Sequence, residues 1–210
     1  MRNIFLTSLI LFSSCFLFAS CEKKLPEDAI YDPRYPETDK IIEEAKDILN
    51  QADHIFMREN YLVELYIQTD DEEIKLVPHF QDVPENLSST FNIIRNKDGN
   101  IMYVAEFPYS ESGDWENIYE SIYDSKGDLI LFVRKSSFLH SDSLNTEVVI
   151  YEKSEYYYSS SHKLLKKTYL MKYAKQDQVP TGVKVDFPYR FDYKKYKTRR
   201  KFLRAHDLDK

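Results

Sequence analysis

Few residues in this sequence have types and spacing that could do chemistry. His140, Ser141 and Asp142 are adjacent and contain the three residue types of a serine hydrolase triad. Neighbours in sequence rarely present their side chains to one another as a nucleophile and its base require, and no glycine-flanked elbow surrounds them. We therefore expect a polar loop here and assign no catalytic residue.

Phosphate and metal chemistry are also disfavoured. The 4 glycines are far apart and none precedes Lys-Ser or Lys-Thr, whereas phosphate-binding loops need clustered glycines. The 5 histidines are not grouped with carboxylates as zinc sites require. Asn96, Asp98 and Gly99 resemble the middle of a calcium loop, but Ile94 and Ala105 occupy its first and last ligand positions, so a hairpin turn is expected. We predict no cofactor and no metal.

Two segments could bind a ligand. Tyr151, Tyr156, Tyr157 and Tyr158 form a tyrosine-rich stretch whose rings could stack on sugars or hold a protein partner, or divide between core and surface of a sheet. A basic segment near the C-terminus could meet anionic lipid or polysaccharide, or fold onto the acidic body of the protein. We expect a binding surface that includes the basic residues Lys194, Lys195, Lys197, Arg199 and Arg200.

The N-terminus has the three parts of an export signal. Arg2 provides a positive charge, Ile4 to Leu17 is an apolar run too short and too interrupted to span a membrane, and small residues precede Cys21. Phe18-Ala19-Ser20-Cys21 resembles the bacterial lipobox, which implies that Cys21 becomes a lipidated N-terminus. The alternative is an ordinary signal that leaves Cys21 as a free thiol. No later cysteine could pair with it, which favours lipidation.

This resemblance implies an exported lipoprotein whose partner is the membrane. Glu22 is not the aspartate that resembles an inner-membrane retention signal, so we expect the outer membrane if the cell has one. The expected organisation is a cleaved signal at 1–20, a proline-rich lipidated tether at 21–36, a single α+β domain at 37–193 and a basic C-terminal tail at 194–210.

Composition favours a sheet. The formal net charge of −6 argues against a nucleic-acid partner. The 17 tyrosines and 13 phenylalanines suit the half-buried surface of strands. Apolar residues from Ile41 to Phe56 recur with a helical period, which predicts one amphipathic helix.

Strands are predicted over most of the remaining chain. Asn96 to Asn100, Asp124 to Asp128 and Ser159 to His162 separate apolar runs and predict successive hairpins. Trp115 to Tyr123 also fits a helical period, but we predict a strand because it leads directly into the second of these turns. Strict alternation from Val183 to Tyr193, with Pro188 facing outward, predicts an edge strand.

The predicted fold is α+β and mainly β, with one N-terminal amphipathic helix packed on an antiparallel meander sheet of about eight strands. The predicted function is that of a non-enzymatic, membrane-anchored envelope lipoprotein that binds a protein or glycan partner. A carrier of lipid or another apolar ligand, and a hydrolase whose residues converge only in space, are the alternatives.

Overall fold

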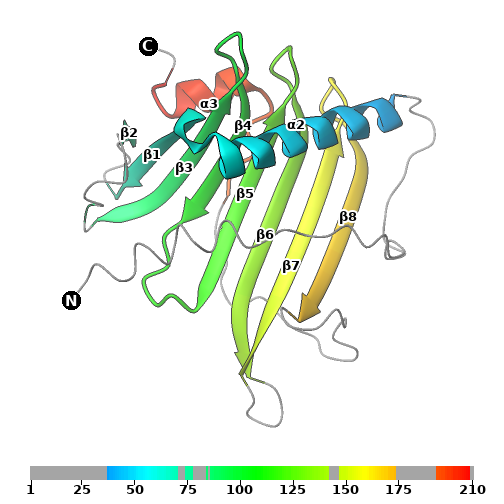
Figure 1. Ribbon diagram of the computed structural model, residues 1–210. Helices are drawn as coiled ribbons and strands as arrows, with labels where there is room; N and C mark the ends of the chain where they lie inside the picture. The colour runs from blue at the N-terminus through cyan, green and yellow to red at the C-terminus, as the bar shows by residue number, and fades with distance from the viewer. Residues whose placement is uncertain are drawn as a thin grey trace.

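The computed structural model describes residues 37–70, 74–77, 84, 86–141, 147–173 and 193–208, with the backbone alone at 140, 141, 147 and 148. The expected signal, Cys21, the tether and residues 183–192 of the expected edge strand lie outside these residues. The described elements are the helices α2 (Thr38–Arg58) and α3 (Arg199–Ala205), the short 3₁₀ helix η1 (Asn60–Leu62), and the strands β1 (Val63–Thr69), β2 (Ile74–Leu76), β3 (Leu87–Arg95), β4 (Ile101–Pro108), β5 (Trp115–Tyr123), β6 (Leu129–Ser141), β7 (Glu147–Tyr158) and β8 (Leu164–Tyr173) (Figure 1).

The described strands form one antiparallel sheet in the order β2-β1-β3-β4-β5-β6-β7-β8. From β3 to β8 each strand pairs with the next along the chain, while β1 lies between β3 and the short strand β2. The mainly β class and the antiparallel sheet are therefore confirmed. The segment Trp115–Tyr123 is β5, and all nine of its residues pair with β6, so the strand prediction for this ambiguous segment is correct. His140 and Ser141 belong to the end of β6, where a loop was expected.

Helix α2 crosses one face of the sheet near one end of the strands (Figure 1). Ala45 and Ala52 are fully buried, and their small side chains allow close approach of the helix to the strands. Phe56 packs edge-on against Tyr103, with ring centroids 5.7 Å apart. The sheet presents to α2 a row of cross-strand neighbours, namely Ile94, Tyr103, Ile122, Leu131 and Tyr157.

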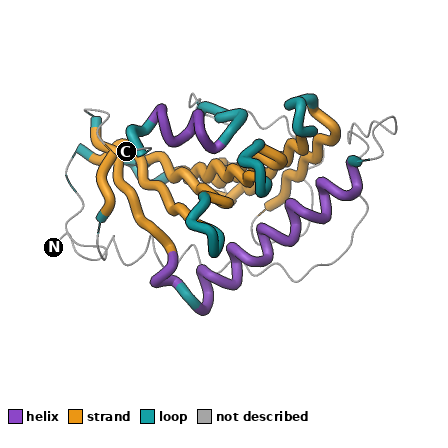
Figure 2. Tube along the Cα trace, turned by 90° about the horizontal axis from the view of Figure 1, so that it is seen from above, coloured by secondary structure: helices purple, strands orange, loops and turns teal. Residues whose placement is uncertain are grey.

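The C-terminal segment, residues 193–208, covers the opposite face of the sheet. Phe202 of α3 is 2 % exposed and packs in one apolar cluster with Phe91 and Phe132. Seen from above, α2 and α3 lie on opposite sides of the strands (Figure 2). Because alternate residues of a strand point to opposite faces, the two helices require apolar side chains on both faces at this end of the sheet. The strands here are accordingly buried at most positions, as in β4 and β5.

Backbone hydrogen bonds fasten the C-terminal segment to the start of β6. The amide of Leu129 donates to the carbonyl of Lys197 over 3.0 Å, and the amide of Arg199 donates to the carbonyl of Gly127 over 2.8 Å. Thr198 is the N-cap of α3, and its hydroxyl accepts a hydrogen bond from the amide of Lys201. The segment expected as a basic tail thus contains a capped helix that packs on the sheet.

Candidate functional site

Strand alternation divides the four tyrosines predicted as a binding surface. Tyr151 and Tyr157 are 5 % and 4 % exposed, and they lie on the face that carries α2. Tyr156 and Tyr158 are half-buried on the opposite face, beside the C-terminal segment. Only the second pair therefore lies near the basic residues that were predicted together with it.

The five basic residues separate in a similar way. Lys194 and Arg200 are exposed, whereas the guanidinium of Arg199 donates to the carbonyl oxygen of Ile101 over 3.2 Å and so has a structural contact. Lys195 and Lys197 line a pocket of about 110 Å³. The structure thus brings two of the predicted cations to one of the predicted tyrosines.

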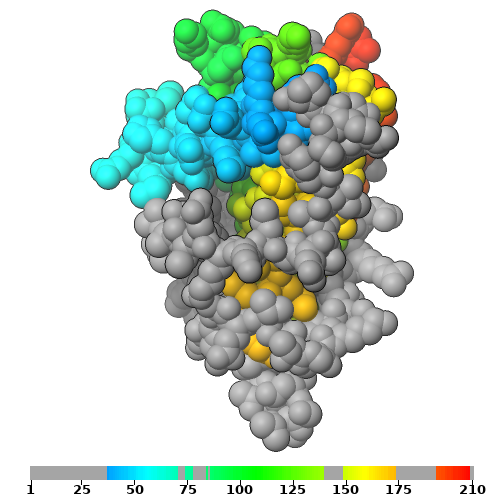
Figure 3. All heavy atoms as spheres, turned by 90° about the vertical axis from the view of Figure 1, so that its right-hand side faces the viewer, coloured from blue at the N-terminus to red at the C-terminus, as the bar shows by residue number. Residues whose placement is uncertain are grey.

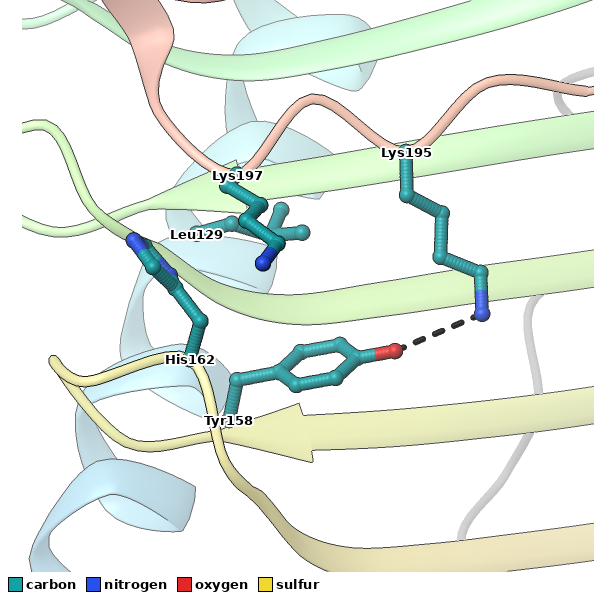
Figure 4. A pocket seen from close by; sticks show the side chains of 5 residues that line it. All are labelled: Leu129, Tyr158, His162, Lys195 and Lys197. Atoms are coloured by element: carbon teal, nitrogen blue, oxygen red, sulfur yellow. Dashed lines mark hydrogen bonds between the residues drawn. The ribbon is translucent and has the colours of Figure 1, made fainter.

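The pocket lies between the β7–β8 turn and the C-terminal segment, at the end of the molecule where both helices lie. Viewed from the side of β8, the yellow atoms at this end of β7 lie beside the blue atoms of α2 and the red atoms of the C-terminal segment (Figure 3). The lining residues are Leu129, Tyr158, His162, Lys195 and Lys197 (Figure 4). The ammonium of Lys195 donates a hydrogen bond to the phenolic oxygen of Tyr158 over 3.3 Å.

Three hairpin turns share one hydrogen-bonding pattern. The turns are β3–β4, β5–β6 and β7–β8, and each has five residues. In each turn the amide of the first residue donates to the carbonyl of the fifth, and the amide of the fourth residue donates to the carbonyl of the first. The side chain of the first residue, which is Asn96, Asp124 or Ser159, also accepts a hydrogen bond from the amide of the fifth residue. The fourth position has positive φ in each turn, and it is occupied by Gly99, Gly127 and His162 respectively.

His162 is therefore a side chain in a position that favours glycine. Its φ of 59° lies in the left-handed region, where residues with a Cβ are uncommon and are strained by about 1–2 kcal/mol. The imidazole lines the pocket, and its Nε2 atom lies 3.9 Å from Oδ1 of Asp128. Sequence reasoning did not select His162. Alignment of the three turns, which places histidine where the other two have glycine, is the signal that could have found it.

Lys195 is held against aromatic rings. Its Nζ atom lies 4.1 Å from the ring centroid of Tyr156, 5.0 Å from that of Phe132 and 5.8 Å from that of Tyr193. The ring faces carry partial negative charge that stabilises the ammonium. Burial lowers the pKa of Lys195, and the nearby positive charges of Arg134 and Lys167 lower it further. Lys195 is thus a partly desolvated cation with cationic neighbours.

Tyr158 supplies a neutral polar group beside Lys195. Burial raises the pKa of its phenol to about 12, with smaller contributions from Tyr156 and Tyr193. The phenol therefore keeps its proton at neutral pH and offers one donor and one acceptor. Leu129 gives the pocket an apolar surface, Tyr158 gives it an aromatic ring, and Lys195 and Lys197 give it cationic nitrogens. This combination is suited to holding a ligand.

A second polar group lies on the α2 face. Oε1 of Glu120 accepts from the phenol of Tyr103 and from Nζ of Lys135, each over 2.7 Å. On the neighbouring strands, Glu155 pairs with Lys153 over 2.6 Å and also accepts from Thr168 and Tyr157. Each of these two carboxylates has a lysine partner, and the carboxylates of Asp53 and Glu116 also interact electrostatically with Lys135. The members of this group could not be selected from sequence because their proximity depends on strand register.

Comparisons with protein family models, with curated proteins and with solved structures found no match for this chain. Within the described residues, no three His, Cys, Asp or Glu side chains are grouped as a metal ion would require. No helix in the described part of the chain is both long enough and apolar enough to cross a membrane. The candidate site is the pocket between the β7–β8 turn and the C-terminal segment.

Proposed function

We propose that this chain is an exported, lipid-anchored, non-enzymatic binding module that holds one sugar residue of an envelope glycan in the pocket lined by Tyr158, His162 and Lys195. The anchor is inferred from the export signal and from the lipobox-like residues that end at Cys21. The glycan partner is inferred from the pocket. An outer-membrane location, where the cell has such a membrane, is inferred because Glu22 is not the aspartate that resembles an inner-membrane retention signal.

The observation that carries this proposal is the position of His162. Gly99 and Gly127 occupy the equivalent place in two turns with the same hydrogen bonds, so glycine fits this backbone without strain. A histidine there costs stability and gains a side chain that lines the pocket. Backbone strain at a residue whose side chain lines a pocket is typical of sites that serve a ligand.

The size and lining of the pocket favour a glycan over a protein partner. Pockets for whole small molecules are roughly 300–1,000 Å³, so a pocket of about 110 Å³ suits one unit of a longer ligand. A stable protein partner typically needs about 800 Å² of surface on each side, with an apolar centre. Tyr158 and Leu129 offer a narrow apolar wall for the C–H face of a sugar, and the nitrogens of Lys195, Lys197 and His162 offer polar contacts for its edge.

The glycan proposal is tested by titrating the mature chain with a panel of envelope oligosaccharides in a calorimeter. We expect binding by the wild type and loss of about tenfold or more in affinity for His162→Gly, the variant that copies the other two turns. Because glycine relieves the strain, that variant should be at least as stable as the wild type in urea. A panel without any binder would contradict the proposal, and a lipid that copurifies in native mass spectrometry would favour the apolar carrier instead.

The anchor is tested by measuring the intact mass of the protein expressed with its own signal, for wild type and Cys21→Ala. We expect an acylated species that starts at Cys21 in the wild type alone, found with the membrane fraction. Two or more acyl chains give stable attachment, since each buried methylene contributes about 0.8 kcal/mol. An unmodified, released protein in both cases would make the chain a secreted factor.

A further inference from the structure

The charges around the pocket do not balance. Arg134 pairs with Glu152 over 2.9 Å, and His162 faces Asp128. Lys167, Lys195 and Lys197 take part in none of the ion pairs formed among the described residues. Among the described residues, the rim of the pocket and the adjacent part of β8 therefore carry more positive than negative charge.

The least solvated of these cations is Lys195. Both Lys195 and Lys167 lie over the same ring of Tyr156, with Nζ-to-centroid distances of 4.1 and 5.6 Å. A ring face attracts a cation by about 0.5–2 kcal/mol, which offsets only part of the cost of removing an ammonium from water beside another positive charge. An anion close to Lys195 would lower the electrostatic energy of all three lysines at once.

The pocket places such an anion within reach of two of them. The side chains of Lys195 and Lys197 leave the same segment and both extend toward Tyr158, with His162 on the other side of Lys197 (Figure 4). The Tyr158 hydroxyl accepts from Lys195 and has its own proton to donate. An anionic group in this space would be attracted by both ammonium groups, and the phenol offers it a hydrogen bond.

We propose that the sugar held in this pocket is an acidic one, whose anionic group is bound by Lys195 and Lys197. This inference rests on the proposed glycan-binding function and specifies its ligand class. Lysine is a compact point charge without the planar fork of arginine, so the pair recognises charge and does not by itself select carboxylate over phosphate. A uronic acid and a phosphorylated sugar both carry the required group.

The test compares ligands that differ in charge alone. The mature chain is titrated with an oligouronide, with the same oligosaccharide after reduction of its carboxyl groups to hydroxymethyl groups, and with a phosphorylated oligosaccharide. We expect the oligouronide or the phosphorylated oligosaccharide to bind about tenfold or more tightly than the reduced one, with affinity that falls as salt is added. Whichever of the two anionic ligands binds more tightly identifies the source of the charge.

Variants assign that preference to the two lysines. Lys197→Ala removes an exposed charge and should reduce the anionic-over-neutral preference several-fold while the thermal midpoint stays within about 2 °C of the wild type. Lys195→Arg should retain the preference, whereas Lys195→Ala should lose it. Lys97→Ala removes another exposed lysine, from the β3–β4 turn, and controls for net charge, so it should leave the preference unchanged.

The remaining outcomes separate this inference from the function on which it rests. If the reduced and acidic oligosaccharides bind equally, the acidic-sugar inference is overturned and glycan binding stands. If no oligosaccharide binds at all, the proposed function itself fails. If an oligoglutamate peptide binds as tightly as the oligouronide, the site binds acidic peptides. The acidic-sugar inference is then overturned in favour of a protein partner.

Discussion

The ammonium of Lys195 donates a hydrogen bond to the phenolic oxygen of Tyr158 over 3.3 Å, across 37 positions of sequence. This contact joins the C-terminal segment to the last residue of β7, at the mouth of the pocket. It is also where the tyrosine-rich stretch and the basic segment, which looked like separate features of the sequence, become one site.

The Tyr158 hydroxyl should contribute modestly to stability. Tyr158→Phe keeps the ring and removes the hydrogen bond, so we expect the free energy of unfolding to fall by about 1 kcal/mol in urea titrations. The matched control is Tyr109→Phe, because Tyr109 is 48 % exposed and its loss of a hydroxyl should cost little. Equal costs for the two variants would contradict a stabilising contact between Lys195 and Tyr158.

A methyl group at Gly127 should cost more than one at Gly99. Both residues have positive φ, at 88° and 77°, so alanine is strained at either position by about 1–2 kcal/mol. A Cβ at Gly127 would also lie 3.2 Å from the guanidinium carbon of Arg199, whereas nothing lies within 4 Å of one at Gly99. Urea denaturation of Gly127→Ala and Gly99→Ala should therefore differ by up to about 1 kcal/mol, the value of the hydrogen bond from Arg199 to Ile101.

A double-mutant cycle tests that explanation for Gly127. In an Arg199→Ala background the guanidinium is absent, so the excess cost of Gly127→Ala over Gly99→Ala should vanish. An excess that persists in this background would show that the contact with Arg199 is not its cause.

His206 should make the protein less stable as the pH falls. Its ring packs against Phe202 and Phe91, with centroids 4.7 and 5.2 Å away, and burial lowers its pKa to about 4, with a further contribution from Lys194. Because the pKa of His206 is lower in the folded state, the unfolded chain binds the proton at a higher pH than the folded chain does. Stability is therefore lost as the pH falls from about 6.5 to about 4. The slope is at most about 1.4 kcal/mol per pH unit. His206→Phe keeps an aromatic ring, and its unfolding free energy should lack this component.

Glu106 should have the opposite effect. Burial raises the pKa of this carboxyl to about 7, although a hydrogen bond from Ser89 favours the charged form. The folded state therefore keeps a proton that the unfolded chain releases near pH 4.5, so the contribution to stability is complete below that pH and is lost as the pH rises to about 7. At pH 8 we expect Glu106→Gln to be more stable than the wild type by about 1–3 kcal/mol, with little difference at pH 4.

The two pH effects overlap, and this gives a sharper test. Between about pH 4.5 and 6.5 the contributions of His206 and Glu106 have opposite signs and partly cancel in the wild type. Relative to the wild type, His206→Phe should lose stability and Glu106→Gln should gain stability as the pH rises through this range. Urea titrations at half-unit intervals measure both trends, and parallel profiles for the three proteins would contradict both assignments.

Local sequence signals predicted much of the sheet. Gly99 and Gly127 mark tight turns because glycine adopts positive φ without strain, and the apolar runs on either side of each turn became paired strands. Trp115 to Tyr123 was ambiguous in period, and its position directly before a turn gave the correct prediction. These signals depend on residues a few positions apart, so they can be recognised without knowledge of the rest of the fold.

The composition of the candidate site was not determined in this way. The sequence by itself predicted an export signal, which remains a prediction, and the hairpins, the tyrosine-rich strand and the basic C-terminal segment. Only the tertiary structure placed Tyr156 and Tyr158 beside Lys195 while Tyr151 and Tyr157 faced α2, and only it brought His162 to the same pocket. The physical reason is that strand register and the face covered by each helix are set by contacts between residues distant in sequence, and a shift of one residue would exchange the two faces.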